Sequence, residues 1–262
     1  MRDGHIHTPY CPHGTKDSIH HYIEKALLLG FKEISFTEHA PLPKKFIDPT
    51  PMKDSSMSFK TLEIYLEKLE KIKTEYQGQL KINKGLEVDY IEGFDGEIQD
   101  FLNTYGPHLD DSILSVHFLR HDGRYDCLDY SPEVFATMVT KYHSVEAIYE
   151  QYYKTVMKSV QTYLGSFKPR RIGHLTLVHK FQKKFPVTKD FNLEIINLLK
   201  EIKENSYELD YNGAGTAKPL CKEPYPPTWI VEIARDIGVP LVYGSDAHQV
   251  KDLNQGKEFM II

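Results

Sequence analysis

The chain has 262 residues, of which 40% are hydrophobic and 26% are charged, an ordinary composition for a globular protein. Its formal net charge of −5 argues against a general nucleic-acid binder or a protein of anionic membrane surfaces, because both classes usually carry a basic face. No apolar run approaches the ~20 residues of a membrane span, and the N-terminal residues do not have the pattern of a secretory signal. We therefore expect a cytoplasmic protein.

Strand-like and helix-like segments alternate along the chain, which is the pattern of parallel strands covered by helices. Seven predicted strands span residues 4–7, 32–37, 81–88, 112–117, 171–175, 208–212 and 239–244. Predicted helices span residues 16–29, 58–77, 95–105, 132–163, 191–203 and 229–237, and the fourth is expected to break near residues 143–144. A polar loop is predicted between the fourth strand and the fourth helix. No repeat or linker divides the sequence, so residues 1–262 are predicted to form one domain.

Three cysteines, Cys11, Cys127 and Cys221, are widely spaced and form no CxxC pair. Neither a disulfide framework nor a thiolate zinc site is indicated, which agrees with a reducing compartment. Cys11 lies near the first histidines, and we interpret it as a buried or loop thiol.

Residue types that bind metals recur where the predicted strands end. His5 and His7 belong to the first strand, and Asp246 and His248 follow the last strand with the same spacing. Side chains two residues apart on a strand leave it on the same face, so each pair can reach one ion. If the sheet curls until its first and last strands are neighbours, the two pairs face each other.

Single residues of the same types occupy the ends of four intervening strands, namely His39, Glu87, His117 and His174. Imidazoles and carboxylates gathered at one rim indicate a metal site, with more ligands than one ion needs. Glu38 competes with His39 for the position after the second strand. We favour His39 as the ligand and interpret Glu38 as a residue that supports a ligand or caps the loop. His13, in the loop after the first pair, is by itself equally compatible with an exposed side chain.

The motifs HIH, EH, GLE, SVH, GH and SDAH occur in this order from His5 to His248, and they resemble the motifs of the polymerase-and-histidinol-phosphatase (PHP) superfamily. The stretches LEVDYI, SVHFL, RIGHLTLVHKF and KPLCKEPYP resemble the branch of that superfamily that acts on histidinol phosphate. The resemblance implies a distorted (βα)7 TIM-like barrel that holds three divalent metal ions. Zinc, iron and manganese all occur in the family, and a ligand set of nitrogen and oxygen suits each of them.

The resemblance also implies how nine residues share the three ions. The implied sets are His5, His7, Glu87 and Asp246; Glu87, His117 and His174; and His13, His39 and His248. Six positive charges against the carboxylates Glu87 and Asp246 would leave about +4, which favours a phosphate dianion. Two ions bridged by Glu87 could share a water whose pKa falls toward ~7, and the resulting hydroxide is the predicted nucleophile.

Basic residues near the rim are candidates to bind the phosphate. A guanidinium can hold two phosphate oxygens at once, and we predict that Arg171 does so and contributes to catalysis, with Arg170 as the alternative. In the loop after the sixth strand, the superfamily often carries an arginine where this chain has Ala217. Lys218 is the remaining candidate there, as a simple point charge.

The segment 40–57 is a long loop with several prolines, and loops of this length tend to be functional. We expect this loop, with Phe46 and Asp48, to close over the imidazole and amino ends of a substrate.

The sequence thus predicts a metal-dependent phosphomonoesterase that converts L-histidinol phosphate into L-histidinol and phosphate in histidine biosynthesis. One alternative keeps the metal site but assigns another small phosphate ester or a nucleotide as the substrate. Two others are an amidohydrolase-type barrel and a metal-binding module without turnover. The acidic net charge and the lack of a basic stripe count against long nucleic acids. Neither the oligomeric state nor the acid that protonates the leaving group is defined by the sequence.

Overall fold

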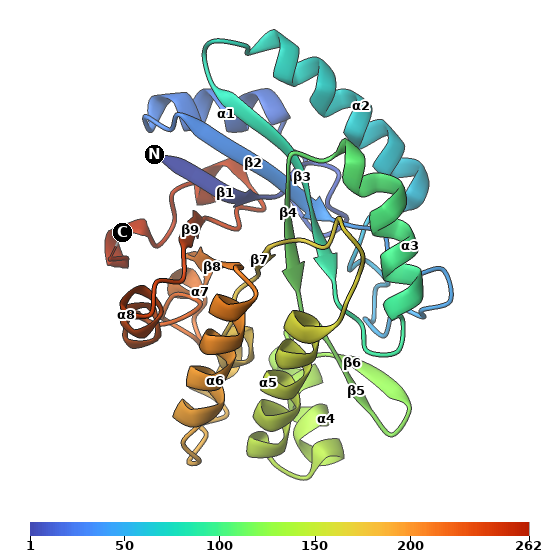
Figure 1. Ribbon diagram of the computed structural model, residues 1–262, viewed down its shortest axis with the longest axis vertical. Helices are drawn as coiled ribbons and strands as arrows, with labels where there is room; N and C mark the ends of the chain where they lie inside the picture. The colour runs from blue at the N-terminus through green and yellow to red at the C-terminus, as the bar shows by residue number, and fades with distance from the viewer. Residues whose placement is uncertain (262) are drawn as a thin grey trace.

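The computed structural model describes residues 1–261 and has one α/β domain built around a nearly closed barrel of parallel strands (Figure 1). Neighbouring strands follow the order β1-β2-β3-β4-β7-β8-β9, and every pairing is parallel. Their bounds are β1 Arg2–Ile6, β2 Glu33–His39, β3 Lys81–Asp89, β4 Asp111–Ser115, β7 Arg171–Ile172, β8 Glu208–Asn212 and β9 Leu241–Gly244. The predicted distorted, TIM-like (βα)7 barrel is confirmed.

The barrel closes through main-chain hydrogen bonds where the ends of β1 and β9 meet. The N–H of Asp246 donates to the carbonyl of His5 at 2.7 Å, and the N–H of His7 donates to the carbonyl of Ala247 at 3.0 Å. Within residues 1–261, a single bridge between Ile6 and Ala247 takes the place of a strand ladder at this seam. The closure brings the HIH and SDAH motifs side by side, as the curled sheet predicts.

Helices cover the outside of the barrel. Figure 1 shows α1, α2 and α3 along one part of its wall and α4, α5 and α6 grouped along another. Their bounds are α1 Ile19–Leu28, α2 Phe59–Glu75, α3 Asp95–Tyr105, α4 Pro132–Tyr142, α5 Val145–Gln161, α6 Asn192–Glu204, α7 Ala214–Ala217 and α8 Thr228–Asp236. Short 3-10 helices are η1 Gly106–His108, η2 Leu177–Phe181, η3 Val250–Asp252 and η4 Lys257–Phe259. In residues 1–261, none of the helices has both the length and the apolar character needed to cross a membrane.

The predicted break between α4 and α5 is confirmed. His143 has a left-handed backbone with φ 72°, and the Ser144 hydroxyl then accepts a hydrogen bond from the N–H of Ala147. A serine at this position satisfies one of the free N–H groups in the first turn of α5.

The predicted polar loop after β4 is instead an antiparallel hairpin. Its strands are β5 Phe118–His121 and β6 Arg124–Cys127, and His121 pairs with Arg124. The two connecting residues, Asp122 and Gly123, both have positive φ, at 47° and 74°. An Asp-Gly pair is the favoured sequence for such a tight turn. The signal for the hairpin was therefore present in the sequence.

Arg171 fills the interior of the barrel near the amino ends of the strands. Only 1% of the residue is exposed, and Nη2 donates to the carbonyl of Gly4 at 2.8 Å and to Asp111 Oδ2 at 2.7 Å. A β-carbon at position 4 would lie 2.4 Å from Nη1 of Arg171, so glycine is needed where the guanidinium crosses β1. The prediction that Arg171 is a catalytic phosphate clamp is therefore wrong. It begins β7, whereas a phosphate-binding residue must lie where the strand ends.

Candidate metal centre

The nine predicted ligands lie together at the carboxyl end of the barrel, which is the end that carries the active site in TIM-type barrels. His5, His39 and Glu87 belong to β1, β2 and β3. The other six follow strand ends directly or lie in the adjoining loops: His7, His13, His117, His174, Asp246 and His248. The structure thus brings all nine to one rim, although they span almost the whole chain.

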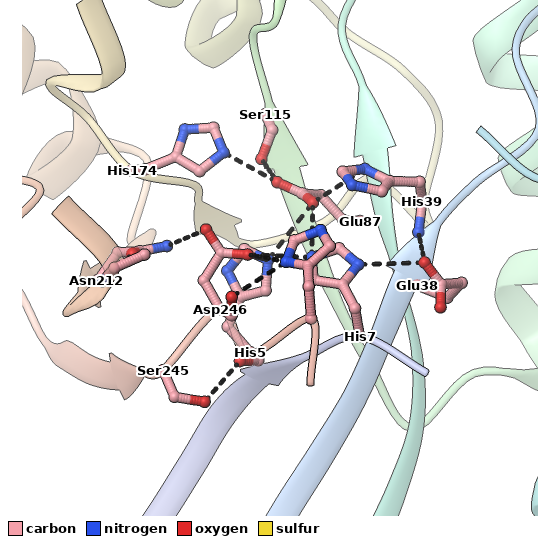
Figure 2. Close-up of polar contacts among 12 residues, drawn as sticks. His5, His7, Glu38, His39, Glu87, Ser115, His174, Asn212, Ser245 and Asp246 are labelled. Carbon is pink, nitrogen blue, oxygen red and sulfur yellow. Dashed lines mark hydrogen bonds and ion pairs between the residues drawn. The ribbon is translucent and has the colours of Figure 1, made fainter. Parts of the chain in front are cut away.

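Glu87 lies at the middle of this group (Figure 2). Its Oε2 atom is 3.3 Å from His5 Nε2 and 3.2 Å from His39 Nδ1. Its Oε1 atom is 2.9 Å from His174 Nε2 and 3.7 Å from His117 Nε2. The two oxygens of one buried carboxylate therefore face two different sets of histidines, as a residue shared by two ions must.

Asp246 contributes the second carboxylate. Its Oδ1 atom lies 3.1 Å from His7 Nε2, 3.8 Å from His5 Nε2 and 3.5 Å from His248 Nδ1. Ligands held at about 2.0–2.2 Å around one tetrahedral ion are about 3.4 Å apart. The separations around Asp246 and Glu87 scatter around this value, so small shifts suffice to place an ion between them.

The third implied set is looser. The ring of His13 lies 5.0 Å from that of His39 and 5.1 Å from that of His248, measured between centroids, and His13 is exposed at the rim. Cys11 is buried, and its thiol lies within 4.8 Å of ligand atoms of His7, His39 and His248. The interpretation of Cys11 as a buried thiol agrees with the structure. Spacing along the chain relates Cys11 only to the first histidines, whereas the fold also places it beside His39 and His248.

A second layer of carboxylates supports three of the histidines. Each of these histidines has Nδ1 close to a buried carboxylate oxygen, in the pairs His5–Asp210 at 2.8 Å, His7–Glu38 at 3.1 Å and His117–Asp89 at 2.7 Å. Such carboxylates keep the proton on Nδ1 and leave Nε2 free to bind a metal. Glu38 thus has the supporting position that we favour for it. Asp89 and Asp210 were missed, although Asp89 follows Glu87 by two residues on the same face of β3.

Several buried ring nitrogens at this rim form no hydrogen bond of acceptable geometry within residues 1–261, although two of them lie close to carboxylate oxygens. They include Nε2 of His7, both ring nitrogens of His39 and Nδ1 of His174. Burying a polar atom without a partner costs free energy, and native proteins rarely do so without a reason. Divalent ions would satisfy His7 and His39 directly, so the side chains at this rim fit the metal ions that the motifs imply.

The carboxylates divide the histidines into two classes. Burial alone would lower the pKa of His7 and His117, but Asp246 and Glu38 raise the pKa of His7 to about 9, and Asp89 with Glu87 raises the pKa of His117 to about 10. Against the same effect of burial, Asp210 and Glu87 hold the pKa of His5 well above its usual range.

The histidines of the second class, His39 and His248, carry no proton at neutral pH. Burial and the neighbouring positive charge of His7 lower the pKa of His39 well below its usual range and that of His248 to about 3. Burial would raise the pKa of Glu87 and Asp246, but the surrounding histidines hold both well below their usual range. Without metal, the centre is therefore a set of imidazolium–carboxylate pairs.

This charge state predicts that metal binding releases protons. At pH 7.5 the metal-free protein carries protons on His5, His7 and His117, and each must lose one to bind through Nε2. We expect saturation with zinc to release about three protons, and zinc affinity to rise as the pH rises. Titration of metal-free protein with zinc in a weak buffer that contains a pH indicator measures this number. Release of less than about one proton would contradict the assigned charge state.

A cavity of about 470 Å³ opens over the candidate centre. Its wall includes Lys218, the predicted phosphate contact, which is exposed. It also includes Lys180 in η2, which the sequence analysis missed. Lys180 Nζ lies 2.8 Å from Asp129 Oδ2, and this pairing outweighs burial and raises the pKa of Lys180. The ammonium group therefore stays charged at neutral pH.

The 40–57 loop also reaches the cavity, but through other residues than predicted. Thr50, Asp54 and Ser55 line the wall, and the carbonyl of Asp54 lies 2.8 Å from His13 Nδ1. Asp48 instead accepts hydrogen bonds from Thr50 and Ser55 within the loop.

Phe46 is also not among the residues that line the cavity. It is buried in an aromatic cluster with Phe94, Phe118 and Tyr125. Neither it nor Asp48 is therefore placed to contact a substrate.

Comparison with known proteins agrees with this geometry. The family model of the PHP domain matches residues 3–214. The chain belongs to the PHP-domain family. It is 51% identical over 98% of its length to a histidinol-phosphatase of Bacillus subtilis, and it covers 97% of that protein.

Two solved structures share the fold. A Listeria monocytogenes crystal structure with a provisional histidinol phosphatase assignment superposes with a TM-score of 0.96, at 40% identity and full coverage of both chains. A Lactococcus lactis histidinol phosphate phosphatase, solved with zinc, L-histidinol and phosphate, has a TM-score of 0.69 at 20% identity. The match covers 95% of this chain and 86% of the Lactococcus chain.

Proposed function

We propose that this PHP-family protein is a metal-dependent phosphomonoesterase that hydrolyses L-histidinol phosphate to L-histidinol and inorganic phosphate. The observation that carries the proposal is the convergence of seven histidines and two carboxylates around Glu87, in a chain 51% identical to a histidinol-phosphatase. The zinc, histidinol and phosphate in the Lactococcus complex support the same substrate class. In this role the enzyme would serve histidine biosynthesis.

The ligand assignment is part of the proposal. We assign three divalent ions, of zinc, iron or manganese, to the sets His5, His7, Glu87 and Asp246; Glu87, His117 and His174; and His13, His39 and His248. Such ions, when bound, activate a water as the nucleophile and neutralise charge on the phosphoryl group. Glu87 and Asp246 have the most direct roles of the side chains, because each contacts histidines of more than one set.

The phosphate end of the substrate is assigned to the side of the cavity lined by Lys180 and Lys218. A lysine ammonium is a compact charge that suits a phosphate dianion. The opposite wall comes from the 40–57 loop, where Asp54 and Ser55 offer oxygen atoms to an amine or imidazole. In this proposal Lys180 takes the phosphate-binding role that the sequence predicts for Arg171.

Replacing Lys180 tests this orientation. We expect Lys180→Gln to raise KM for L-histidinol phosphate about 10-fold or more, because a hydrogen bond to a charged group contributes about 1.5–3 kcal/mol. Lys184→Gln is the matched control, since Lys184 is half-exposed and lies four residues further along the chain, in the turn after η2. Steady-state kinetics of both variants measure this effect. A KM of Lys180→Gln equal to that of Lys184→Gln would contradict a place for Lys180 in the phosphate site.

The substrate itself is tested with metal-replete protein and a panel of phosphate esters. We expect phosphate release to be fastest from L-histidinol phosphate, to vanish on chelation and to return with zinc or manganese. Faster turnover of a nucleotide or another small ester would reassign the substrate, and no release from any ester would contradict the phosphatase proposal.

A cytoplasmic location, without nucleic-acid or membrane partners, remains a prediction for this protein. The three cysteines are free and buried in the structure, and this is compatible with a reducing compartment.

A further inference from the structure

Asn212 ends β8 at the rim of the barrel, and its side chain is completely buried. Its backbone is fixed by two hydrogen bonds with Tyr225, one in each direction and both 2.8 Å long. Its side-chain Oδ1 accepts the N–H of Ala214 at 2.9 Å. This last contact fixes the orientation of the amide, because a flipped amide would place its NH2 group against the N–H of Ala214.

The NH2 group consequently faces two carboxylates. Nδ2 lies 3.2 Å from Asp246 Oδ2 and 3.1 Å from Asp210 Oδ2 (Figure 2 shows the first contact). An amide nitrogen carries two hydrogens, so it can donate to both oxygens at once. A single side chain therefore bridges a buried and a partly buried carboxylate that would otherwise repel each other.

Both carboxylates act on the candidate centre. With Oδ2 of Asp246 held by Asn212, its other oxygen, Oδ1, is turned toward His7 and His248. Asp210 Oδ2 contacts His5 Nδ1 at 2.8 Å, which turns Nε2 of His5 toward Glu87. Asn212 thus orients one candidate ligand directly and a second one through Asp210.

We infer that Asn212 is a positioning residue of the metal centre, which holds Asp246 and, through Asp210, His5 in the geometry that binds an ion. The inference rests on the proposed metal-dependent function. Asn212 does not itself line the cavity, although its partners Ala214, Tyr225 and Asp246 do. Both hydrogen bonds that its side chain donates go to carboxylates of the centre, so its side chain acts on the reaction mainly through the ligands. Its removal should weaken metal binding and turnover while leaving substrate affinity nearly unchanged.

The test uses two variants and one control. Asn212→Ala removes both donated hydrogen bonds and the acceptor of the Ala214 N–H. Asn212→Asp keeps the shape and an oxygen for Ala214 but places a third carboxylate beside Asp210 and Asp246. Asn83→Ala is the matched control, because Asn83 is also a buried strand asparagine whose Nδ2 donates twice, to Glu33 and Ser35. Zinc affinity is measured at one fixed pH by competition with a chelator, together with the visible spectrum of the cobalt-loaded protein and the unfolding temperature.

We expect each Asn212 variant to lose about 10–100-fold in zinc affinity and in kcat, with an altered cobalt spectrum and KM within about 3-fold of wild type. Asn83→Ala should lower only the unfolding temperature. Wild-type zinc affinity and cobalt spectrum in both folded Asn212 variants would overturn the inference, as would the same losses in Asn83→Ala. If wild-type protein does not hydrolyse L-histidinol phosphate but this metal-binding pattern holds, the proposed function fails and the positioning role stands.

Discussion

Glu87→Gln is expected to abolish turnover, with kcat lower by at least about 10³-fold, because bound ions supply several kcal/mol of transition-state stabilisation. Glutamine preserves the shape of the side chain but not its charge. The two carboxylate oxygens of Glu87 contact histidines of all three ligand sets, and Ser115 Oγ donates to Oε1 at 2.6 Å. One neutral amide cannot replace a carboxylate that faces positive charge on both sides. Bound metal should fall below the wild-type amount in the same preparation.

Steady-state kinetics and metal analysis by mass spectrometry measure both effects. Glu67→Gln on α2 is the control, because Glu67 is exposed and, among residues 1–261, its ion pair is with Lys71 on its own helix. Its kcat and metal content should equal those of wild type. Near-normal turnover in Glu87→Gln would refute the central position of Glu87.

Arg171→Ala is expected to destabilise the fold by about 3–5 kcal/mol, since it breaks a largely buried ion pair and removes the large side chain that fills the barrel interior. Within residues 1–261, Asp111 would keep Arg2 at 2.7 Å as its remaining cationic partner, and a void would open inside the barrel next to Gly4. The centre lies at the other end of the strands. The KM of the folded fraction for L-histidinol phosphate should therefore stay within about 3-fold of wild type.

Urea denaturation gives the free energy of unfolding, and kinetics at low temperature give KM for the folded protein. Arg170→Ala is the matched control, because Arg170 is the preceding residue in the chain and is exposed. It should change the free energy of unfolding by no more than about 0.5 kcal/mol. A stable Arg171→Ala protein with a strongly raised KM would restore the phosphate-clamp role and contradict the buried position.

The positions of the candidate ligands could be predicted from sequence because each depends only on where its own strand ends. In a parallel barrel every strand end points to the same rim, so the places of His39, Glu87 and His174 follow once the strands are found. The HIH and SDAH pairs needed only one more condition, closure of the sheet, and the main-chain hydrogen bonds from Asp246 to His5 and from His7 to Ala247 provide it.

The errors have a common physical cause, since each depends on the direction of one side chain in three dimensions. The predicted fifth strand already begins at Arg171, but β7 has only two residues in the sheet, so periodicity could not tell that the Arg171 side chain lies inside the barrel. Lys180 reaches the cavity from a 3-10 helix, which has no strong sequence pattern. Asp210 supports His5 across 205 residues of chain, and no local signal marks such a contact.

Crystals of zinc-loaded protein, with an anomalous difference map at the zinc edge, test the metal centre most directly. We expect three peaks at the carboxyl rim, each about 2.0–2.3 Å from its nearest nitrogen and oxygen ligands, with Glu87 between two of them. A map without peaks among His5, Glu87, His174 and Asp246, with these side chains turned away from one another, would contradict the assignment of a metal centre to this rim.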